Sequence, residues 1–243
     1  MRPDETQVVV LAGGMGTRLG EAGRLHPKVL QPVGGRAFID LMLHPLIEQG
    51  FHRFLFCLGH LSDQVVAHVE AQYRQLDMTF HIDAHPVGTA GSLMACRPLL
   101  AETFLLVLGD TYFDIDYGVM LDRLASDALA VMAITDAVDE VPGNVEVRGD
   151  LVTLYRVGLG RQTPWVDCGA LVLRRQALEL LGGIAPPIDL ARLYERLIPR
   201  AFLRAHAVDS PFYDIGTPER LARFARQADV VLTDLAPRLS SSE

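Results

Sequence analysis

Four short apolar runs in the first half of the chain limit the folds that this sequence can adopt. Each is rich in Val, Leu or Phe, lacks regular polar alternation, and ends at polar or glycine residues: Val8–Ala12, Phe54–Gly59, Phe104–Leu108 and Leu129–Ile134. Strands that are buried on both faces have this composition, as in a parallel sheet covered by helices.

Segments with helical spacing separate these runs. Phe38–Gln49 carries apolar residues on one face, and Pro45 is expected to kink or interrupt that helix. Asp63–Gln75 and Gly88–Ala101 are predicted as the next two helices. The alternation predicts a Rossmann-like, mostly parallel, twisted α/β sheet flanked by helices over residues 1–135.

The pattern changes beyond residue 135, where a hairpin, a strand and three helices are expected. In order they are Asn144–Val147 with Leu151–Tyr155, Trp165–Leu173, Gln176–Leu181, Ile188–Leu197 and Pro218–Thr233. We therefore expect one domain over residues 1–235, with a first half to residue 135 and a second half that completes a cleft. Residues 236–243 are expected to be a flexible tail.

Composition excludes several classes of protein. The 243 residues are 49% hydrophobic and 21% charged, which is a globular composition, and the net charge of −8 argues against a nucleic-acid-binding surface. The sequence contains no apolar run of roughly 18 residues, as a membrane span would need, and shows no secretory signal pattern. Three widely spaced cysteines predict buried free thiols and a cytoplasmic location. The eight histidines show no metal-ligand spacing.

A glycine-rich loop directly follows the first apolar run. Three glycines in four positions, Gly13, Gly14 and Gly16, leave backbone N–H groups free to surround phosphate oxygens. The spacing matches neither an ordinary P-loop nor a dinucleotide fingerprint, and a plain strand exit is the alternative. Arg18 and Lys28 lie close in sequence and favour the anion-binding interpretation.

Four segments in one order carry a specific family resemblance. The glycine-rich loop with Pro27-Lys28 resembles the signature of the sugar-1-phosphate nucleotidylyltransferases. Pro86–Leu93 resembles the second glycine segment of that family, and Leu108–Thr111 and Phe212–Pro218 resemble its two metal-binding aspartate segments. The chain is most similar to the D-glycero-D-manno-heptose 1-phosphate guanylyltransferase group.

The resemblance implies the nucleotide-diphospho-sugar transferase fold and a Mg²⁺-dependent reaction. A sugar 1-phosphate oxygen attacks the α-phosphorus of a nucleoside triphosphate, and pyrophosphate leaves. Arg18 and Lys28 are the expected catalytic cations, and Asp110 and Asp214 the expected metal ligands, Asp110 being counted as catalytic too. A turn or helix-cap role is the alternative for each aspartate, and it is the preferred interpretation for Asp114 and Asp116, which lie close by in the sequence.

The resemblance also implies the binding residues. The expected nucleotide-binding residues are Leu11, Ala12, Gly13, Gly14, Met15, Gly16, Thr17, Gly88 and Thr89. The expected sugar-binding residues are Gly143, Asn144 and Asp167. The sequence departs from the family where many members carry a Glu-Lys pair, because Val157-Gly158 and its neighbours lack one; Arg156 or Arg161 is a candidate substitute.

Several functions remain open at this point. GDP-D-glycero-D-manno-heptose is the expected product, with mannose-1-phosphate guanylyltransferases and N-acetylmuramate or hexose 1-phosphate uridylyltransferases as rivals. A catalytically silent nucleotide-sugar-binding subunit is an alternative of another class, whereas an NAD-dependent oxidoreductase is disfavoured by the loop spacing. The expected partners are a nucleoside triphosphate and a sugar 1-phosphate, without nucleic acid or membrane. The number of subunits is left open, a homo-oligomer included.

Overall fold

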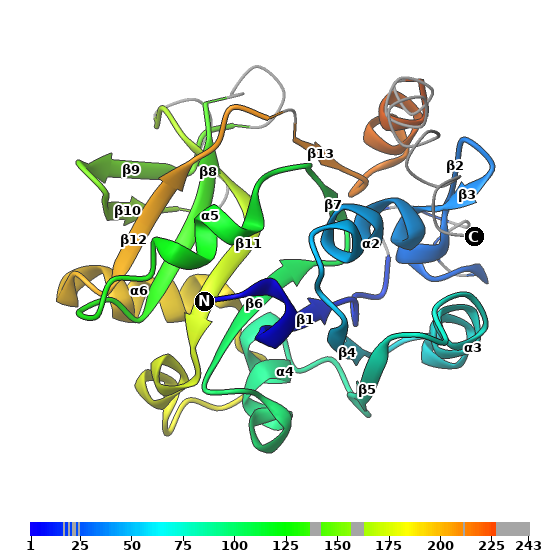
Figure 1. Ribbon diagram of the computed structural model, residues 1–243, viewed down its shortest axis with the longest axis horizontal. Helices are drawn as coiled ribbons and strands as arrows, with labels where there is room; N and C mark the ends of the chain where they lie inside the picture. Colours follow the sequence, from blue (N-terminus) through cyan, green and yellow to red (C-terminus); the bar gives the residue numbers. More distant parts are fainter. Residues whose placement is uncertain are drawn as a thin grey trace.

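A nine-stranded sheet forms the centre of the protein in a computed structural model that describes residues 1–16, 18, 20, 23, 25–136, 142–156, 163–210 and 212–226. The strand order is β5-β4-β1-β6-β11-β8-β12-β10-β9, and Figure 1 shows the sheet crossing the molecule from β5 to β9. The strands are β1 Gln7–Leu11, β4 Arg53–Leu58, β5 Asp77–Ile82, β6 Thr103–Leu108, β8 Ala130–Thr135, β9 Val145–Arg148, β10 Leu151–Tyr155, β11 Val166–Arg174 and β12 Leu203–Ala207.

Two pairs of short strands and a set of helices complete the described fold. The short strands are β2 Pro32–Val33 with β3 Arg36–Ala37, and β7 Thr111–Tyr112 with β13 Tyr213–Asp214. The α-helices are α2 Phe38–Glu48, α3 Ser62–Gln72, α4 Thr89–Ala95, α5 Tyr117–Asp122 and α6 Leu190–Leu197, and residues 218–226 are also helical. The 3₁₀ helices are η1 Pro3–Glu5, η3 Lys28–Leu30, η4 Arg97–Leu99, η5 Arg175–Leu181 and η6 Ile198–Arg200.

Two hydrophobic cores, one on each face of the sheet, explain why the apolar runs lack alternation. Val8 and Val10 of β1 belong to the core that contains residues of α2, α3 and α5, whereas Val9 and Leu11 belong to the core that contains residues of α4 and α6. Successive side chains of a strand point to opposite faces, so both kinds of position must be apolar. The Rossmann-like α/β class predicted from these runs, a sheet flanked by helices, is confirmed.

The sheet is parallel in its first half and mixed beyond it. β5, β4, β1 and β6 are parallel neighbours, and β11 then enters antiparallel between β6 and β8. The predicted hairpin is present as β9 and β10. Both halves of the chain contribute to one sheet; the predicted domain division remains a prediction.

Several predicted elements need correction. Pro45 was expected to kink or interrupt its helix; it lies inside α2, which continues to Glu48, so an interruption is excluded. The segment after Gly88 is shorter than predicted, because α4 ends at Ala95 and a 3₁₀ turn follows. The segment Gln176–Leu181 forms part of the 3₁₀ helix η5. The predicted helix Pro218–Thr233 is described only to residue 226, and the predicted tail lies outside the described residues.

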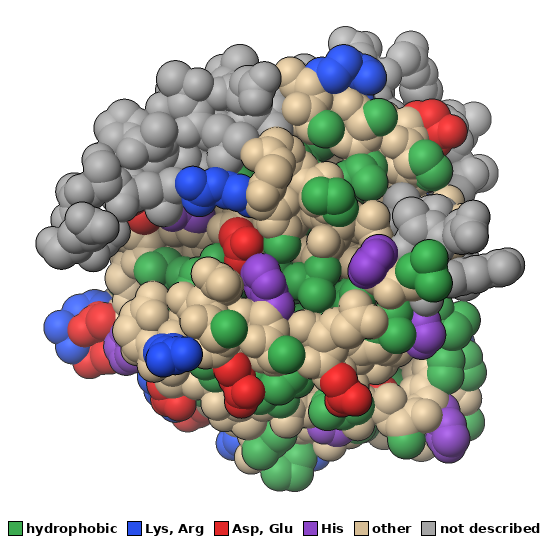
Figure 2. Space-filling view, turned by 90° about the vertical axis from the view of Figure 1, so that its right-hand side faces the viewer, with side chains coloured by type: hydrophobic (Ala, Val, Ile, Leu, Met, Phe, Trp, Pro, Cys, Tyr) green, Lys and Arg blue, Asp and Glu red, His purple; other side chains and the backbone are tan. Residues whose placement is uncertain are grey.

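The face shown in Figure 2 carries acidic, basic and histidine side chains that are scattered over it, and its Lys and Arg side chains do not gather into a stripe. Within the described ranges, no helix has both the length and the apolar character that crossing a bilayer requires. Cys57, Cys96 and Cys168 are buried free thiols, as predicted.

Candidate functional site

The carboxyl ends of β1, β4, β5 and β6 meet at one edge of the sheet and surround a cavity of about 560 Å³. Ligands of open α/β sheets bind at this edge, because the loops that leave parallel strands converge there. The cavity is lined by Leu11, Ala12, Gly13, Gly14, Met15, Lys28, Val29, Cys57, Gly59, His60, Asp83, Ala84, His85, Pro86, Val87, Gly88, Thr89, Ser92, Leu108, Gly109, Asp110 and Asp189.

Glycines allow the loops around the cavity to approach one another closely. A Cβ atom on Gly59 would lie 2.7 Å from the carbonyl oxygen of Gly13, so the loops after β1 and β4 are in contact through backbone. Gly88 has a φ of +79°, and a Cβ there would lie 2.5 Å from the carbonyl oxygen of Ile188. Side chains at these positions would push the cavity walls apart. The glycines therefore set the shape of the cavity.

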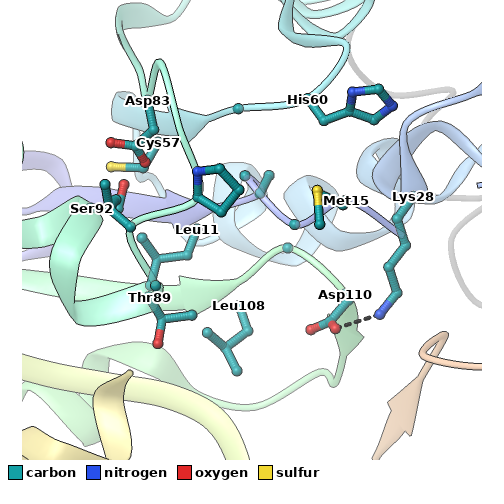
Figure 3. A pocket seen from close by; sticks show the side chains of 18 of the residues that line it. Leu11, Met15, Lys28, Cys57, His60, Asp83, Thr89, Ser92, Leu108 and Asp110 are labelled. Carbon is teal, nitrogen blue, oxygen red and sulfur yellow. Dashed lines mark hydrogen bonds and ion pairs between the residues drawn. The ribbon is translucent and has the colours of Figure 1, made fainter. Parts of the chain in front are cut away.

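One end of the cavity holds an ion pair between two predicted catalytic residues. Lys28 Nζ donates to Asp110 Oδ2 at 2.5 Å, and Figure 3 shows the two side chains facing each other. The Lys28 side chain is only 12% exposed, so it is not the solvated surface charge that its position after a proline would also allow. Lys28 is the first residue of η3, and Asp110 lies just after β6, so two separate segments of the chain supply the ion pair.

The second predicted metal ligand lies beside the first. β13 pairs with β7 so that Asp214 is opposite Thr111, and the Ile215 N–H donates to the Asp110 carbonyl oxygen at 3.0 Å. Asp214 accepts hydrogen bonds from the Gly216 N–H at 2.6 Å and from Arg220. The structure therefore brings Asp110 and Asp214 to one corner, although their sequence positions are far apart.

Arg18 is exposed and lies near this corner. Its terminal nitrogen is 3.7 Å from the place that a Cβ on Gly216 would occupy, and the Asp214 carboxylate lies close to that place too. Arg18 and Gly16 are not among the residues that line the cavity, and Thr17 lies outside the described residues. The other predicted nucleotide-binding residues, from Leu11 to Met15 with Gly88 and Thr89, all line it.

The opposite end of the cavity is formed by residues to which the sequence analysis gave no binding role. Asp83 directly follows β5, Ser92 lies in α4, and Cys57 is in β4. Figure 3 shows these three side chains grouped together, away from Lys28 and Asp110. The alternation of polar and apolar residues in Asp77–Ile82 would have identified β5, and with it Asp83 at a strand end.

The three predicted sugar-binding residues lie next to one another but not in the lining of this cavity. Asn144 Oδ1 accepts from the Asp167 N–H at 2.9 Å, and a Cβ on Gly143 would overlap the Thr163 carbonyl oxygen. These contacts tie the hairpin to β11. Their role toward a sugar remains a prediction.

Asp167 has an altered acidity. Burial raises the pKa of its carboxyl to about 6, although hydrogen bonds from the Gly169 N–H and from the hydroxyls of Tyr155 and Tyr194 favour the charged form. The Tyr155 and Tyr194 rings pack edge to face beside it, with centroids 4.6 Å apart.

Replacing Asp167 by asparagine should stabilise the protein relative to the wild type as pH rises. The folded state holds the Asp167 proton more tightly than the unfolded chain does, so the stability that the protonated group contributes at low pH is lost between about pH 4 and pH 6–7. The asparagine variant has no proton to lose there. Urea unfolding at pH 4.5 and pH 8 should show a relative gain of roughly 1–2 kcal/mol for the variant. A relative loss at pH 8 would contradict this.

Comparison with known families decides the class of protein. A model of the MobA-like NTP transferase domain matches residues 8–162, which include the glycine-rich loop, Lys28, Asp83 and Asp110. This chain belongs to that family. The membership confirms the enzyme class expected from the four sequence segments, because NTP transferases move a nucleotidyl group from a nucleoside triphosphate.

Two curated relatives and one solved structure are similar to this chain over different shares of its length. The D-glycero-alpha-D-manno-heptose 1-phosphate guanylyltransferase of Campylobacter jejuni is 22% identical over 90% of this chain and 98% of its own length. The UTP–glucose-1-phosphate uridylyltransferase AglF of Haloferax volcanii is 27% identical over 55% of each chain. The structure of HddC from Yersinia pseudotuberculosis complexed with GMP-PN aligns with a TM-score of 0.76 at 23% identity, covering 91% of this chain and 99% of that one.

Proposed function

We propose that this NTP transferase joins a sugar 1-phosphate to the α-phosphorus of a nucleoside triphosphate, forming a nucleoside-diphosphate sugar and releasing pyrophosphate. The observation that carries the proposal is the cavity at the sheet edge, where a wall of glycine backbone ends at the Lys28–Asp110 ion pair. Such a site suits a long anion that must be held along its phosphates and approached by a second anion.

The reaction needs no nucleophile from the protein. An oxygen of the sugar phosphate, already ionised near neutral pH, forms a bond to the α-phosphorus while the bond from that phosphorus to the bridging oxygen of the β-phosphate breaks. Two anions must meet in line, so positioning and charge neutralisation dominate. We assign the half-buried Lys28 to the position between the reacting phosphates, and the exposed Arg18 to the triphosphate.

We assign a Mg²⁺ ion to the corner that Asp110 and Asp214 share. The ion prefers oxygen ligands and usually keeps several waters, so two carboxylates with phosphate oxygens are a suitable set. No cluster of three or more His, Cys, Asp or Glu side chains with metal-binding geometry occurs in the part of the chain that the structure describes, so water and substrate would supply the remaining ligands. When bound, Mg²⁺ would neutralise charge on the phosphates.

Among the possible substrates, we favour GTP and D-glycero-D-manno-heptose 1-phosphate. The heptose 1-phosphate guanylyltransferase relative aligns with this chain over 98% of its own length. The similar structure of HddC is a complex with GMP-PN. Because another relative is a UTP–glucose-1-phosphate uridylyltransferase, UTP with a hexose 1-phosphate is the second candidate pair of substrates.

Pyrophosphate release, measured with a panel of sugar 1-phosphates and all four nucleoside triphosphates, tests the proposal. We expect turnover with one sugar class, and the highest kcat/KM with GTP and the heptose 1-phosphate. Mannose 1-phosphate, glucose 1-phosphate and N-acetylmuramate 1-phosphate belong in the panel as rivals. Clear nucleotide binding without turnover for any pair would instead identify a catalytically silent binding subunit.

A further inference from the structure

Both carboxylates of the corner assigned to a metal ion already have a basic partner. Lys28 Nζ donates to Oδ2 of Asp110, and Arg220 Nη1 donates to Oδ2 of Asp214. The Asp214 side chain is only 15% exposed, so its charge is poorly solvated and the guanidinium replaces much of the missing water. The proposed reaction uses Lys28 but gives Arg220 no task.

The helix over residues 218–226 places Arg220 at this corner. Phe224, one turn further along the same helix, is fully buried and packs against the ring of Tyr213 in β13, with centroids 5.0 Å apart. Residues four apart lie on the same face of a helix. The docking of Phe224 on β13 therefore holds Arg220 beside Asp214, which is the next residue of that strand.

The two oxygens of the Asp214 carboxylate differ in how easily their partners can leave. Oδ1 accepts from the Gly216 N–H at 2.6 Å, and that donor is part of the backbone turn before the helix. Oδ2 accepts from Arg220, whose side chain is 36% exposed and ends a flexible stem. A metal ion that takes Asp214 as a ligand would therefore replace Arg220 at Oδ2, while the backbone hydrogen bond stays.

The charges at the corner oppose the binding of a metal ion by itself. Arg18, Lys28 and Arg220 lie around Asp110 and Asp214, so three positive and two negative side chains leave an excess of one positive charge. A divalent cation would add two more positive charges at short range. A polyphosphate carries several negative charges and offsets this excess. The corner should therefore bind the metal ion and a polyphosphate together.

We propose that Arg220 couples the two binding events: its guanidinium occupies Asp214 in the free protein and moves to a phosphate oxygen when Mg²⁺ and a polyphosphate bind. This inference rests on the proposed function, because it uses the metal corner and the polyphosphate substrate assigned there. Arg220 then has one anionic partner in each state, so its charge is never left unpaired. Loss of its contact with Asp214 is offset only when a phosphate is present.

The side chain can make this exchange without movement of its helix. Mg²⁺ holds oxygen ligands at about 2.0–2.1 Å, so phosphate oxygens on an ion bound by Asp214 lie close to the carboxylate oxygen that Arg220 contacts now. Rotation of the side chain suffices to reach them, and the buried Phe224 can keep its place. The five N–H groups of a guanidinium suit phosphate oxygens as well as carboxylates.

Calorimetric titrations with Mg²⁺ alone, with pyrophosphate plus a chelator, and with preformed magnesium pyrophosphate test the proposal without sugar phosphate or turnover. The wild type should bind Mg²⁺ alone weakly, and should bind pyrophosphate at least about 10-fold more tightly with Mg²⁺ than without it. Coupling between two ligands is reciprocal, so either order of addition should give the same factor.

Arg220→Gln should change the two affinities in opposite directions. Mg²⁺ alone should bind about 10-fold more tightly than to the wild type, because the Asp214 charge is no longer neutralised by a guanidinium. Magnesium pyrophosphate should bind about 5- to 10-fold more weakly than to the wild type, because a charged donor to phosphate is lost. The enhancement of pyrophosphate binding by Mg²⁺ should fall accordingly.

Two further variants control for charge and for folding. Arg220→Lys keeps the charge without the planar fork, so it should bind Mg²⁺ alone as weakly as the wild type and magnesium pyrophosphate about 3- to 5-fold more weakly. Arg200→Gln removes an equal charge from an exposed arginine of η6 and should leave all affinities unchanged. Thermal unfolding of each variant checks the fold.

Several outcomes would overturn the proposal. Unchanged affinities in Arg220→Gln, with only a lower melting temperature, would show that the ion pair merely ties the helix to β13. Weaker binding of Mg²⁺ alone by Arg220→Gln would show that the arginine orients Asp214 for the ion instead of competing with it. If Arg220→Gln does not fold, wild-type affinity of Arg220→Lys for magnesium pyrophosphate would refute the phosphate contact.

The titrations also separate this inference from the proposed function. If no sugar 1-phosphate reacts but Arg220→Gln shifts the affinities as expected, the proposed function fails and the role of Arg220 stands. If a sugar 1-phosphate reacts but Arg220→Gln leaves the affinities unchanged, the proposed function stands and the role of Arg220 fails.

Discussion

Replacing Lys28 by alanine should lower kcat by about 10²–10³-fold while weakening nucleoside triphosphate binding by less than about fivefold. The Lys28 ammonium is mostly buried and is held at the end of the cavity by Asp110. Under the proposed function this cation lies where negative charge accumulates between the two reacting phosphates, so its effect should be larger in the transition state than in the bound ground state. Pyrophosphate release gives kcat, and calorimetric titration gives the nucleotide Kd.

The conservative variant Lys28→Arg separates charge from geometry. Lys28 is the only lysine in the sequence, and the other 21 basic side chains counted as Lys+Arg are arginines. A planar guanidinium differs in shape and reach from an ammonium, so arginine should restore only part of the lost rate. Full activity of Lys28→Ala would remove the residue from the reaction. A loss confined to Kd would reassign it to ground-state binding.

The elements that the sequence predicted well are those buried on both faces. β1, β4, β6 and β8 are nearly continuous apolar runs, because helices cover each side of them. β5 was missed although it alternates, because it is an edge strand whose side chains are half exposed. Pro45 was overrated as a helix breaker, since the packing of Leu43 and Leu46 in one core holds α2 together across it.

In the candidate site, residues next to an apolar strand could be predicted, whereas contacts between segments far apart in the sequence could not. The glycine-rich loop and Asp110 could be predicted because each directly follows an apolar strand. The pairing of Lys28 with Asp110, 82 residues apart in sequence, follows only from the meeting of the β1 and β6 loops. The contact of Arg220 with Asp214 was missed because no spacing in the sequence indicates it, and Asp83 was missed together with β5, the strand that it follows.

Under the proposed function, replacing Asp110 by asparagine should lower turnover by about 10³-fold or more while leaving the fold intact. The substitution keeps the side-chain shape but removes one of the two carboxylates at the corner shared with Asp214, and it also weakens the hold on Lys28. Turnover measured across a Mg²⁺ titration, with thermal unfolding as the check on folding, gives the result. Asp114→Asn, which replaces an exposed carboxylate close by in the sequence, should behave as the wild type.

A double variant distinguishes a metal role for Asp110 from a role that only positions Lys28. If Asp110 merely orients the ammonium, then Lys28→Ala with Asp110→Asn should be no slower than Lys28→Ala alone, because the group to be oriented is already gone. If Asp110 binds the ion that neutralises the phosphates, the double variant should be at least about 10-fold slower than either single variant. It should also require more Mg²⁺ for half-maximal rate than Lys28→Ala does. Near-normal turnover of Asp110→Asn would exclude both roles.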